Sequence, residues 1–272
     1  MAHTIYNNFV LANEIEDQYN SYLDLVRFCT VDNSLVGTPG MTKRINVYRA
    51  TDGTEKLTMG QGNTKDIEVS YTDEEYTILM AQNRFYYYDE QEMTDPLVVT
   101  TGLRHMAVDM FNTVNADVFA EFGKVGTTQT LYTGAANTAF DFGIFADAVA
   151  LLNIEGAEDA LNAEVFAFIH PSDMAALRKT LKDELKYVES FVRTGYIGTV
   201  AGVNLYTKKD ATAGEIRGGV KTAVTLFNKK GTEVEQDRDS DIRKNTVWSR
   251  KYYLAALTDE TKAFKLVRGT QS

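Results

Sequence analysis

Between positions 95 and 124, apolar residues recur at intervals of three and four, the spacing that lines one face of an α-helix. Asp95 suits the N-cap and Pro96 the first helical position, while Gly123 and Lys124 suit the C-terminal end. The pattern predicts one long helix from Asp95 to Lys124. Such a helix is typical of a rigid strut in an assembly, and also of the core of a globular enzyme. The repeating residues are Val99, Leu103, Met106, Met110, Val114, Val118 and Phe122.

From Lys43 to Met80, apolar and polar residues alternate with a period of two, as in half-buried strands. Ile45 and Val47 mark one predicted strand, and Ile67 to Tyr71 mark a second. The segments between them are turn residues without an apolar anchor, so the tip is expected to project. A two-stranded ribbon in water is marginally stable by itself. The ribbon and the helix together therefore indicate a subunit built for assembly.

Charged residues gather in two places, and both are candidate inter-subunit contacts. In the ribbon they can form ion pairs across subunits or lie scattered over a solvated hairpin. In the acidic run from Glu233 to Lys244, the interspersed arginines indicate ion pairing within the subunit or across an interface. That run lacks the glycine of a calcium loop. The ribbon candidates are Arg44, Arg49, Glu55, Lys56, Lys65 and Asp66, and those of the acidic run are Asp237, Arg238, Asp239, Asp241 and Arg243.

The remaining pattern predicts an α+β protein in which one unit interrupts another. A helix is expected around Asn13 to Phe28. A mixed α/β unit is expected from Thr138 to about Lys230, and strands after Thr232 are expected to return to the long helix. The elements expected after Thr127 are a helix from Asp141 to near Gly156, a strand at 165–169, a helix from Pro171 through Leu185, and strands at 196–206, 223–227, 247–257 and 263–267.

Composition narrows the function classes. A chain of 272 residues that is 44% apolar can bury a substantial core in one large domain or two intimate ones. A net charge of −10 disfavours a dedicated nucleic-acid binder, so a protein of this kind near DNA would enclose it instead of gripping it. No apolar stretch is long enough to span a membrane and no signal peptide is evident, which predicts a protein that is made and used in a cytoplasm.

The sequence contains few residues in arrangements that indicate catalysis or metal binding. One cysteine, Cys29, and three histidines provide too few ligands for a structural zinc site. Three spaced glycines from Gly195 to Gly202 lack the ending of a phosphate-binding loop. His170 precedes Pro171 at a predicted strand end, where it can be a hydrogen-bonded structural residue or a base that acts with carboxylates. We predict no catalytic, cofactor-binding or metal-binding residue.

Three short sequence segments resemble segments of the major capsid protein of tailed bacteriophages, which has the Hong Kong 97-type fold. They are Phe166-Ala167-Phe168-Ile169-His170-Pro171-Ser172, then Tyr196-Ile197-Gly198-Thr199-Val200-Ala201-Gly202-Val203, and finally Asp237-Arg238-Asp239 followed by Arg250-Lys251-Tyr252. None is a sharp motif alone, and the resemblance lies in their succession. It implies an N-terminal arm at 1–36, an extended β-hairpin loop at 37–82, a peripheral domain at 83–137 with a spine helix at 95–124, an inserted axial domain at 138–230, and peripheral return strands at 231–272.

The resemblance also implies a function without enzyme activity. Subunits would assemble as pentamers and hexamers into an icosahedral head that encloses double-stranded DNA without sequence-specific contacts, in the host cytoplasm and then in the virion. We expect a portal and a separate scaffolding protein, or no scaffold, because the chain begins almost at the arm. Some relatives cross-link lysine to asparagine, but Lys56, Lys65 and Asn245 match too loosely to predict this. The alternatives are an encapsulin-like nanocompartment shell and a cytosolic α/β hydrolase that uses His170.

Overall fold

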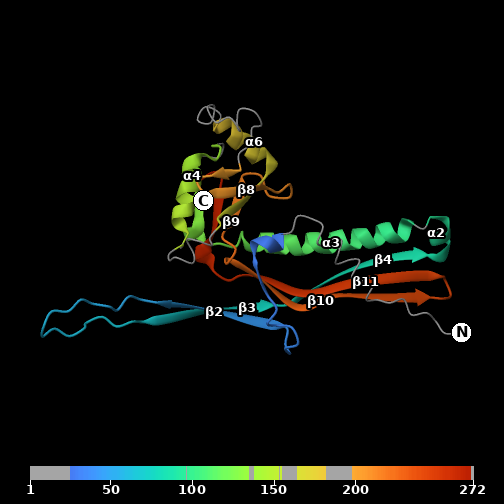
Figure 1. Cartoon of the computed structure of the whole chain (residues 1–272), viewed down its shortest axis with the longest axis horizontal. Coiled ribbons are helices and arrows are strands. Elements are labelled where there is room, and N and C mark those ends of the chain that lie inside the picture. Colours follow the sequence, from blue (N-terminus) through green and yellow to red (C-terminus); the bar gives the residue numbers. More distant parts are fainter. Residues whose placement is uncertain are drawn as a thin grey trace.

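The computed structural model describes residues 25–95, 97–134, 138–152, 154, 164–181 and 198–270, and at 47–49 and 72 it describes the backbone alone. Within these ranges the chain is a mixed α+β protein with a four-stranded sheet, a six-stranded sheet and a separate two-stranded ribbon. Figure 1 shows the ribbon projecting from one end of the molecule, with the six-stranded sheet standing above the long helix α3.

The four-stranded sheet has the order β1-β10-β11-β4. β1 runs parallel to β10, and the other neighbours are antiparallel. Helix α3 lies along one face, and short α2 leads from β4 into it (Figure 1). The bounds are β1 Thr30–Asp32, β4 Leu79–Tyr88, β10 Val224–Asp239, β11 Lys244–Leu257, α2 Asp89–Thr94 and α3 Leu97–Glu121.

Buried and exposed side chains alternate along β4, and this alternation explains how α3 packs on the sheet. Phe85 and Tyr87 belong to the apolar cluster that also contains Leu103 of α3, while Tyr86 between them is 48% exposed. Gly102 lies where the helix crosses the strand, since a Cβ there would come within 2.3 Å of the Phe85 ring. The missing side chain therefore allows helix and strand to approach closely.

The six-stranded sheet has the order β5-β12-β9-β6-β8-β7, and helices α4 and α6 pack against one face of it. Asp141 is the N-cap of α4, and His170 is the N-cap of α6. The backbone N–H of Ile144 donates to Asp141 Oδ1 over 3.0 Å at the start of α4. The bounds are β5 Thr130–Tyr132, β6 Phe166–Ile169, β7 Thr199–Val200, β8 Val203–Thr207, β9 Glu215–Gly219, β12 Ala263–Val267, α4 Phe142–Leu151 and α6 Pro171–Thr180.

Strand β6 joins the two sheets because both of its faces are buried. Ala167 and Ile169 face the core of α4 and α6. Phe166 and Phe168 face the last turns of α3, where the Phe122 and Phe166 ring centroids are 5.5 Å apart. This double burial explains why the strand reads as a continuous apolar run.

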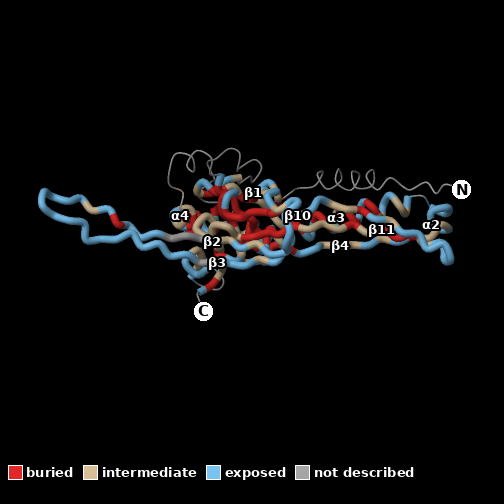
Figure 2. Tube along the Cα trace, turned by 90° about the horizontal axis from the view of Figure 1, so that it is seen from below, coloured by how far each residue is buried: buried red, intermediate tan, exposed pale blue. Residues whose placement is uncertain are grey.

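The ribbon pairs β2 (Thr42–Ala50) with β3 (Val69–Thr77) in antiparallel register from one end to the other. Its base is anchored, because Ile45 and Tyr76 pack against the cluster of Ile78, Phe227 and Leu254 on the four-stranded sheet. Farther out the side chains are exposed, and Figure 2 shows the distal ribbon almost entirely in the exposed class. Three short 3₁₀ turns complete the described elements: η1 Leu25–Phe28, η2 Thr127–Gln129 and η3 Glu260–Lys262.

Most predicted elements are confirmed with small changes of bounds. The long helix ends three residues before Lys124, and Asp95 does cap it, since its Oδ1 accepts the Leu97 N–H over 3.0 Å. The strand expected from Tyr196 divides into β7 and β8 at Ala201, whose φ is 49°. Parts of the chain named in the predictions lie outside the described residues: Asn13 to Asp24, Pro96, Gly156, Leu185, and Gly195 to Ile197.

Two expected strand partnerships are wrong. β12 does not return to the long helix with β11, since it pairs with β9 and β5 in the six-stranded sheet. The strand expected at 223–227 is the first part of β10, which belongs to the four-stranded sheet and not to the α/β unit. Both errors have one cause. An apolar pattern indicates that a strand is buried, but it does not identify the sheet to which the strand belongs.

Candidate inter-subunit surfaces

Arg44 and Glu75 form an ion pair between the two strands of the ribbon. Arg44 Nη2 lies 3.3 Å from Glu75 Oε2, and the two side chains are 67% and 52% exposed. An exposed pair of this kind contributes roughly 0 to 1 kcal/mol of stability. Arg49 lies opposite Ser70 in the strand register. The Arg44 pair joins the two strands of the ribbon and does not tie the ribbon to the body of the subunit.

At the ribbon tip, Glu55 is bound within the loop. It accepts the backbone N–H of Thr64 and the Thr64 hydroxyl, each over 3.0 Å. The other three candidates, Lys56, Lys65 and Asp66, are exposed. The tip therefore has one carboxylate that braces the loop and three charged side chains that face outward.

The remaining candidates lie at the turn between β10 and β11, beside helix α2. Arg238 Nη2 donates to Asp89 Oδ2 over 2.6 Å, and Asn245 Nδ2 donates to the other Asp89 oxygen over 2.7 Å. The hydrogen bond from Arg238 lowers the pKa of the Asp89 carboxyl. Arg243 Nε lies 2.7 Å from Glu90 Oε1. These contacts attach the hairpin end to α2 within one subunit.

Three acidic candidates of this end, Asp237, Asp239 and Asp241, are exposed. Asp239 Oδ1 accepts the backbone N–H of Asp241 over 3.1 Å, which shapes the turn. The partners Asp89, Glu90 and Asn245 were not predicted from the sequence. Asp89 and Glu90 are acidic residues at the start of a helix, which is a recognisable pattern. Their pairing with Arg238 and Arg243 could not be predicted, because these arginines are far away in the sequence.

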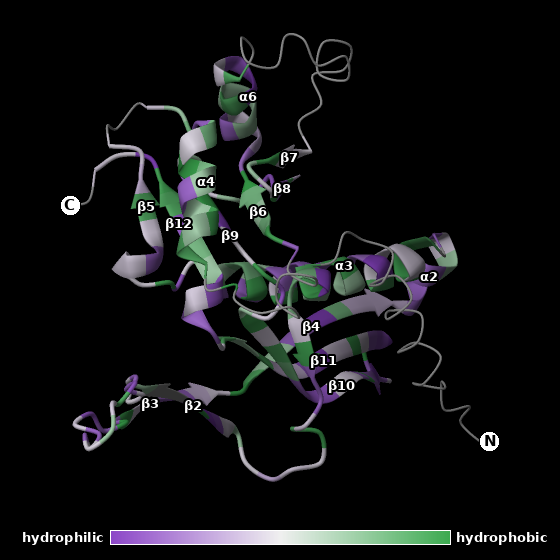
Figure 3. Cartoon of the chain, turned by 60° about the vertical axis from the view of Figure 1, so that its left-hand side comes forward, coloured by the Kyte–Doolittle hydropathy of each residue, from purple (hydrophilic) through white to green (hydrophobic). Residues whose placement is uncertain are grey.

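The candidates at the ribbon tip lie at one end of the molecule, and those at α2 and the β10–β11 turn lie at the other end (Figure 1). Figure 3 shows hydrophilic residues, in purple, at both ends. One copy of the chain therefore cannot bring its own two groups together. A contact that joins one group to the other must therefore involve two copies.

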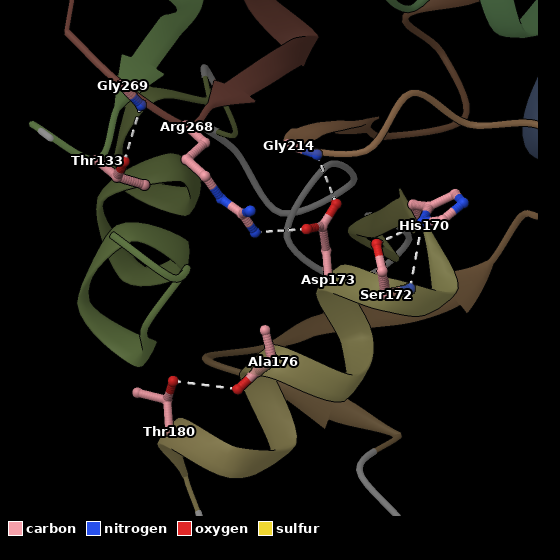
Figure 4. Close-up of polar contacts among 9 residues, drawn as sticks. All are labelled: Thr133, His170, Ser172, Asp173, Ala176, Thr180, Gly214, Arg268 and Gly269. Carbon is pink, nitrogen blue, oxygen red and sulfur yellow. Dashed lines mark hydrogen bonds and ion pairs between the residues drawn. The ribbon is translucent and has the colours of Figure 1, made fainter. Parts of the chain in front are cut away.

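His170, the candidate base, is the N-cap of α6. Its Nδ1 accepts the backbone N–H of Ser172 over 3.2 Å and lies 2.6 Å from the Ser172 hydroxyl (Figure 4). The neighbouring carboxylate of Asp173 is directed elsewhere, since it accepts from Gly214 N and from Arg268 Nη2. His170 therefore serves the first turn of its own helix, as a structural residue does.

Within the described ranges, no group of three or more histidine, cysteine, aspartate or glutamate side chains is placed to hold a metal ion. The described helices include none that is both long and apolar enough to span a membrane.

The chain is similar to known shell proteins along nearly its whole length. A family model described as phage capsid protein matches residues 72–266. The major capsid protein of Staphylococcus phage phiMR11 is 26% identical over 277 residues, which cover 97% of this chain and 93% of that relative.

Solved structures share the fold at low sequence identity. The capsid of Ralstonia phage GP4 is similar with a TM-score of 0.65 and 10% identity, over 90% of this chain and 88% of that one. The holo-SrpI encapsulin complex from Synechococcus elongatus PCC 7942 is similar with a TM-score of 0.61 and 12% identity, over 98% and 89%.

The mixed α+β architecture, with its long helix and projecting ribbon, is the Hong Kong 97-like fold that these structures share. The chain belongs to the phage capsid protein family, because the family model matches more than half of it. It is a phage major capsid protein, a structural protein and not an enzyme.

Proposed function

We propose that this chain self-assembles into pentamers and hexamers that close into an icosahedral phage head around double-stranded DNA. The observation that carries the proposal is the ribbon, whose distal half lies outside every apolar cluster of the described subunit. Such a ribbon gains burial only against another molecule. Modest contacts of this kind, repeated around a closed shell, stabilise the whole particle.

The parts of the subunit take the following roles in this proposal. Residues 1–36 form the N-terminal arm, 37–82 the extended loop, 83–137 the peripheral domain, 138–230 the axial domain around the five-fold and six-fold axes, and 231–272 the return to the peripheral domain. The strand pairing supports one adjustment, in which β12 contributes to the axial unit and all of β10 to the peripheral one.

The proposed partners follow from charge and from the shell itself. A net charge of −10 repels phosphate groups, which favours a lining that encloses DNA without sequence-specific contacts. Assembly would take place in the host cytoplasm, with a portal and a separate scaffolding protein, and the product would be the virion. The charged residues at both ends of the chain are the proposed inter-subunit contacts.

Removal of the ribbon tip tests this function. Deleting Thr51 to Asn63 leaves Ala50 joined to Val69 by a short loop, so the subunit should fold with its two sheets intact. We expect soluble subunits with an unchanged far-ultraviolet circular dichroism spectrum and no closed particles by electron microscopy. A variant with a Gly/Ser segment of equal length at 51–63 is the matched control for loop length. Normal shells from the deletion variant would refute the role of the ribbon.

A protein-filled nanocompartment is the second candidate, because the encapsulin complex from Synechococcus elongatus has the same fold. The contents of purified particles separate the two functions. A phage head holds nuclease-protected double-stranded DNA when packaging is complete, whereas a nanocompartment would hold a protein cargo and no DNA.

A further inference from the structure

The ribbon tip is braced by its own polar contacts. The Gln61 N–H donates to the Thr58 carbonyl over 3.1 Å, and Gly60 between them has a φ of 90°, so Thr58 to Gln61 form a tight turn. Thr58 Oγ1 also donates to Gln61 Oε1 over 2.8 Å. Together with the contacts between Glu55 and Thr64, these bonds fix the loop before it meets any partner.

The apex of this braced turn displays an apolar side chain to solvent. Met59 is 104% exposed and Leu57 is 46% exposed. Behind them Gly53 is buried against Ile67, since a Cβ on Gly53 would lie 2.5 Å from Ile67 Cγ1. A preorganised loop with a fully exposed methionine at its apex has the form of a knob that fits a hole in another surface.

An open apolar groove lies at the base of the same ribbon. Its cavity has a volume of about 560 Å³. Val36 is 56% exposed and Met41 is 45% exposed, so the groove presents apolar surface to solvent. Its lining includes Val36, Thr38, Pro39, Met41, Lys229 and Tyr252.

The groove wall is also held in place. Lys229 Nζ donates to the carbonyl oxygen of Thr38, which ties the loop at 36–40 to strand β10. Another part of the wall is a cross-strand pair, since Tyr252 lies opposite Lys230 in the register of β10 and β11. Both the knob and the hole are therefore formed before assembly.

We propose that Met59 at the ribbon tip of one copy inserts into the groove between Val36, Met41 and Tyr252 of the next copy. This inference rests on the proposed shell function and assigns the surface that receives the ribbon. The contact is heterologous, because two different surfaces of identical chains meet, and repetition of such a contact closes into a ring when the rotation between copies allows it.

The occupant of the groove is a second copy for two reasons. The tip and the groove lie at opposite ends of one ribbon, so a chain cannot fill its own groove (Figure 1). Charge also favours the contact. Residues 51–68 carry four carboxylates and two lysines. The groove is lined by Lys229 and Lys230, of which Lys230 pairs with Glu233, so Lys229 supplies its net positive charge. The tip is thus net negative where the groove is positive.

The contact sets the distance between neighbouring subunits. At about 3.3 Å per residue, the chain from Met41 to Met59 spans at most about 60 Å. Adjacent grooves in a ring should therefore lie no farther apart than about 60 Å.

Cysteine cross-linking in assembled particles tests the contact directly. In a Cys29→Ala background, Met59→Cys and Val36→Cys are combined, and purified particles are oxidised and run on a non-reducing gel. We expect a ladder of covalent multimers at least tenfold stronger than in the matched control pair Met59→Cys with Met93→Cys, in which the second cysteine replaces a residue that is 84% exposed at the far end. Particles mixed from the two single variants should give dimers and nothing larger.

Side-chain chemistry supplies a second measurement. Met59→Asp should lower the particle yield at least tenfold, whereas Met59→Leu should keep it, since the groove accepts an apolar group and not a charge. Particles that form normally while the Met59–Val36 pair cross-links no more than the control would overturn the docking contact and leave the shell function intact. Failure of the unmodified chain to form shells with or without a scaffold would overturn both.

Discussion

Asp173 joins three segments that are distant in the sequence. It lies in the first turn of α6, is 1% exposed, accepts the Gly214 N–H over 2.6 Å and pairs with Arg268 after β12. Asp173→Ala leaves the Arg268 guanidinium without this partner and should lower the free energy of unfolding by about 3 kcal/mol. Urea unfolding followed by circular dichroism measures the loss. Asp237→Ala, at an exposed position, is the control and should change stability by less than about 0.5 kcal/mol.

Glu215 should make part of the stability depend on pH. Burial by itself raises the pKa of this carboxyl, but hydrogen bonds from Arg217 and Lys265 outweigh it, so the pKa lies below its ordinary value of 4.5. A carboxyl whose pKa is lower in the folded state stabilises the protein above pH 4.5 and loses this effect as pH falls through the folded-state pKa. The wild type should therefore exceed Glu215→Gln in melting temperature at pH 7 and approach it at pH 3. A constant difference between the two proteins across this range would contradict the assignment.

The types of residue at the candidate contacts were readable from the sequence, but their partners were not. Arg238 and Asp89 are 149 positions apart, and only the antiparallel pairing of β11 with both β10 and β4 brings them together. Capping residues were easier to predict, because the interaction is local. Asp141 and Asp95 each accept an N–H within three residues of their own position.

The crossing of α3 over β4 depends on Gly102. In a solvent-exposed helix, replacing glycine by alanine stabilises by about 1 kcal/mol. Here the new Cβ would lie 2.3 Å from the Phe85 ring, which is also stacked on Tyr87. Gly102→Ala should therefore destabilise the protein by about 1 to 3 kcal/mol, in the opposite direction to helix propensity. Thermal unfolding decides the sign, and Phe85→Leu in the same chain should recover part of the loss by making room.

Periodicity predicted the elements better than their partners. The threes and fours of α3 and the alternation of the ribbon depend on local geometry, which one segment of chain specifies by itself. β12 shows the limit of this reasoning. Ala263, Phe264 and Leu266 are fully buried, so the strand was evident, but either sheet could have supplied that burial. Its partners are β9 and β5, and the pattern of apolar residues in β12 does not identify them.

The described subunit combines a well-packed body with an extension that the body does not cover. The two sheets and α3 share contiguous apolar clusters through β6, whereas the ribbon contacts the body only at its base. Segments with few buried contacts open at low free energy, while core strands open only near global unfolding. In an unassembled subunit the ribbon should therefore be the more easily opened part, and burial in a shell should reverse this.

Limited proteolysis compares the two states of the ribbon. Lys56 and Lys65 flank the exposed turn at Met59, so trypsin should cleave there in unassembled subunits. In closed particles the proposed contact would place a neighbouring copy over the tip, so cleavage at these lysines should slow at least tenfold. Mass spectrometry of the fragments identifies the cuts, and a Lys56→Gln, Lys65→Gln variant shows which of them arise in the ribbon. Equal cleavage rates at these lysines in free subunits and in particles would mean that the tip stays uncovered in the shell, and that the ribbon stabilises the assembly through its base alone.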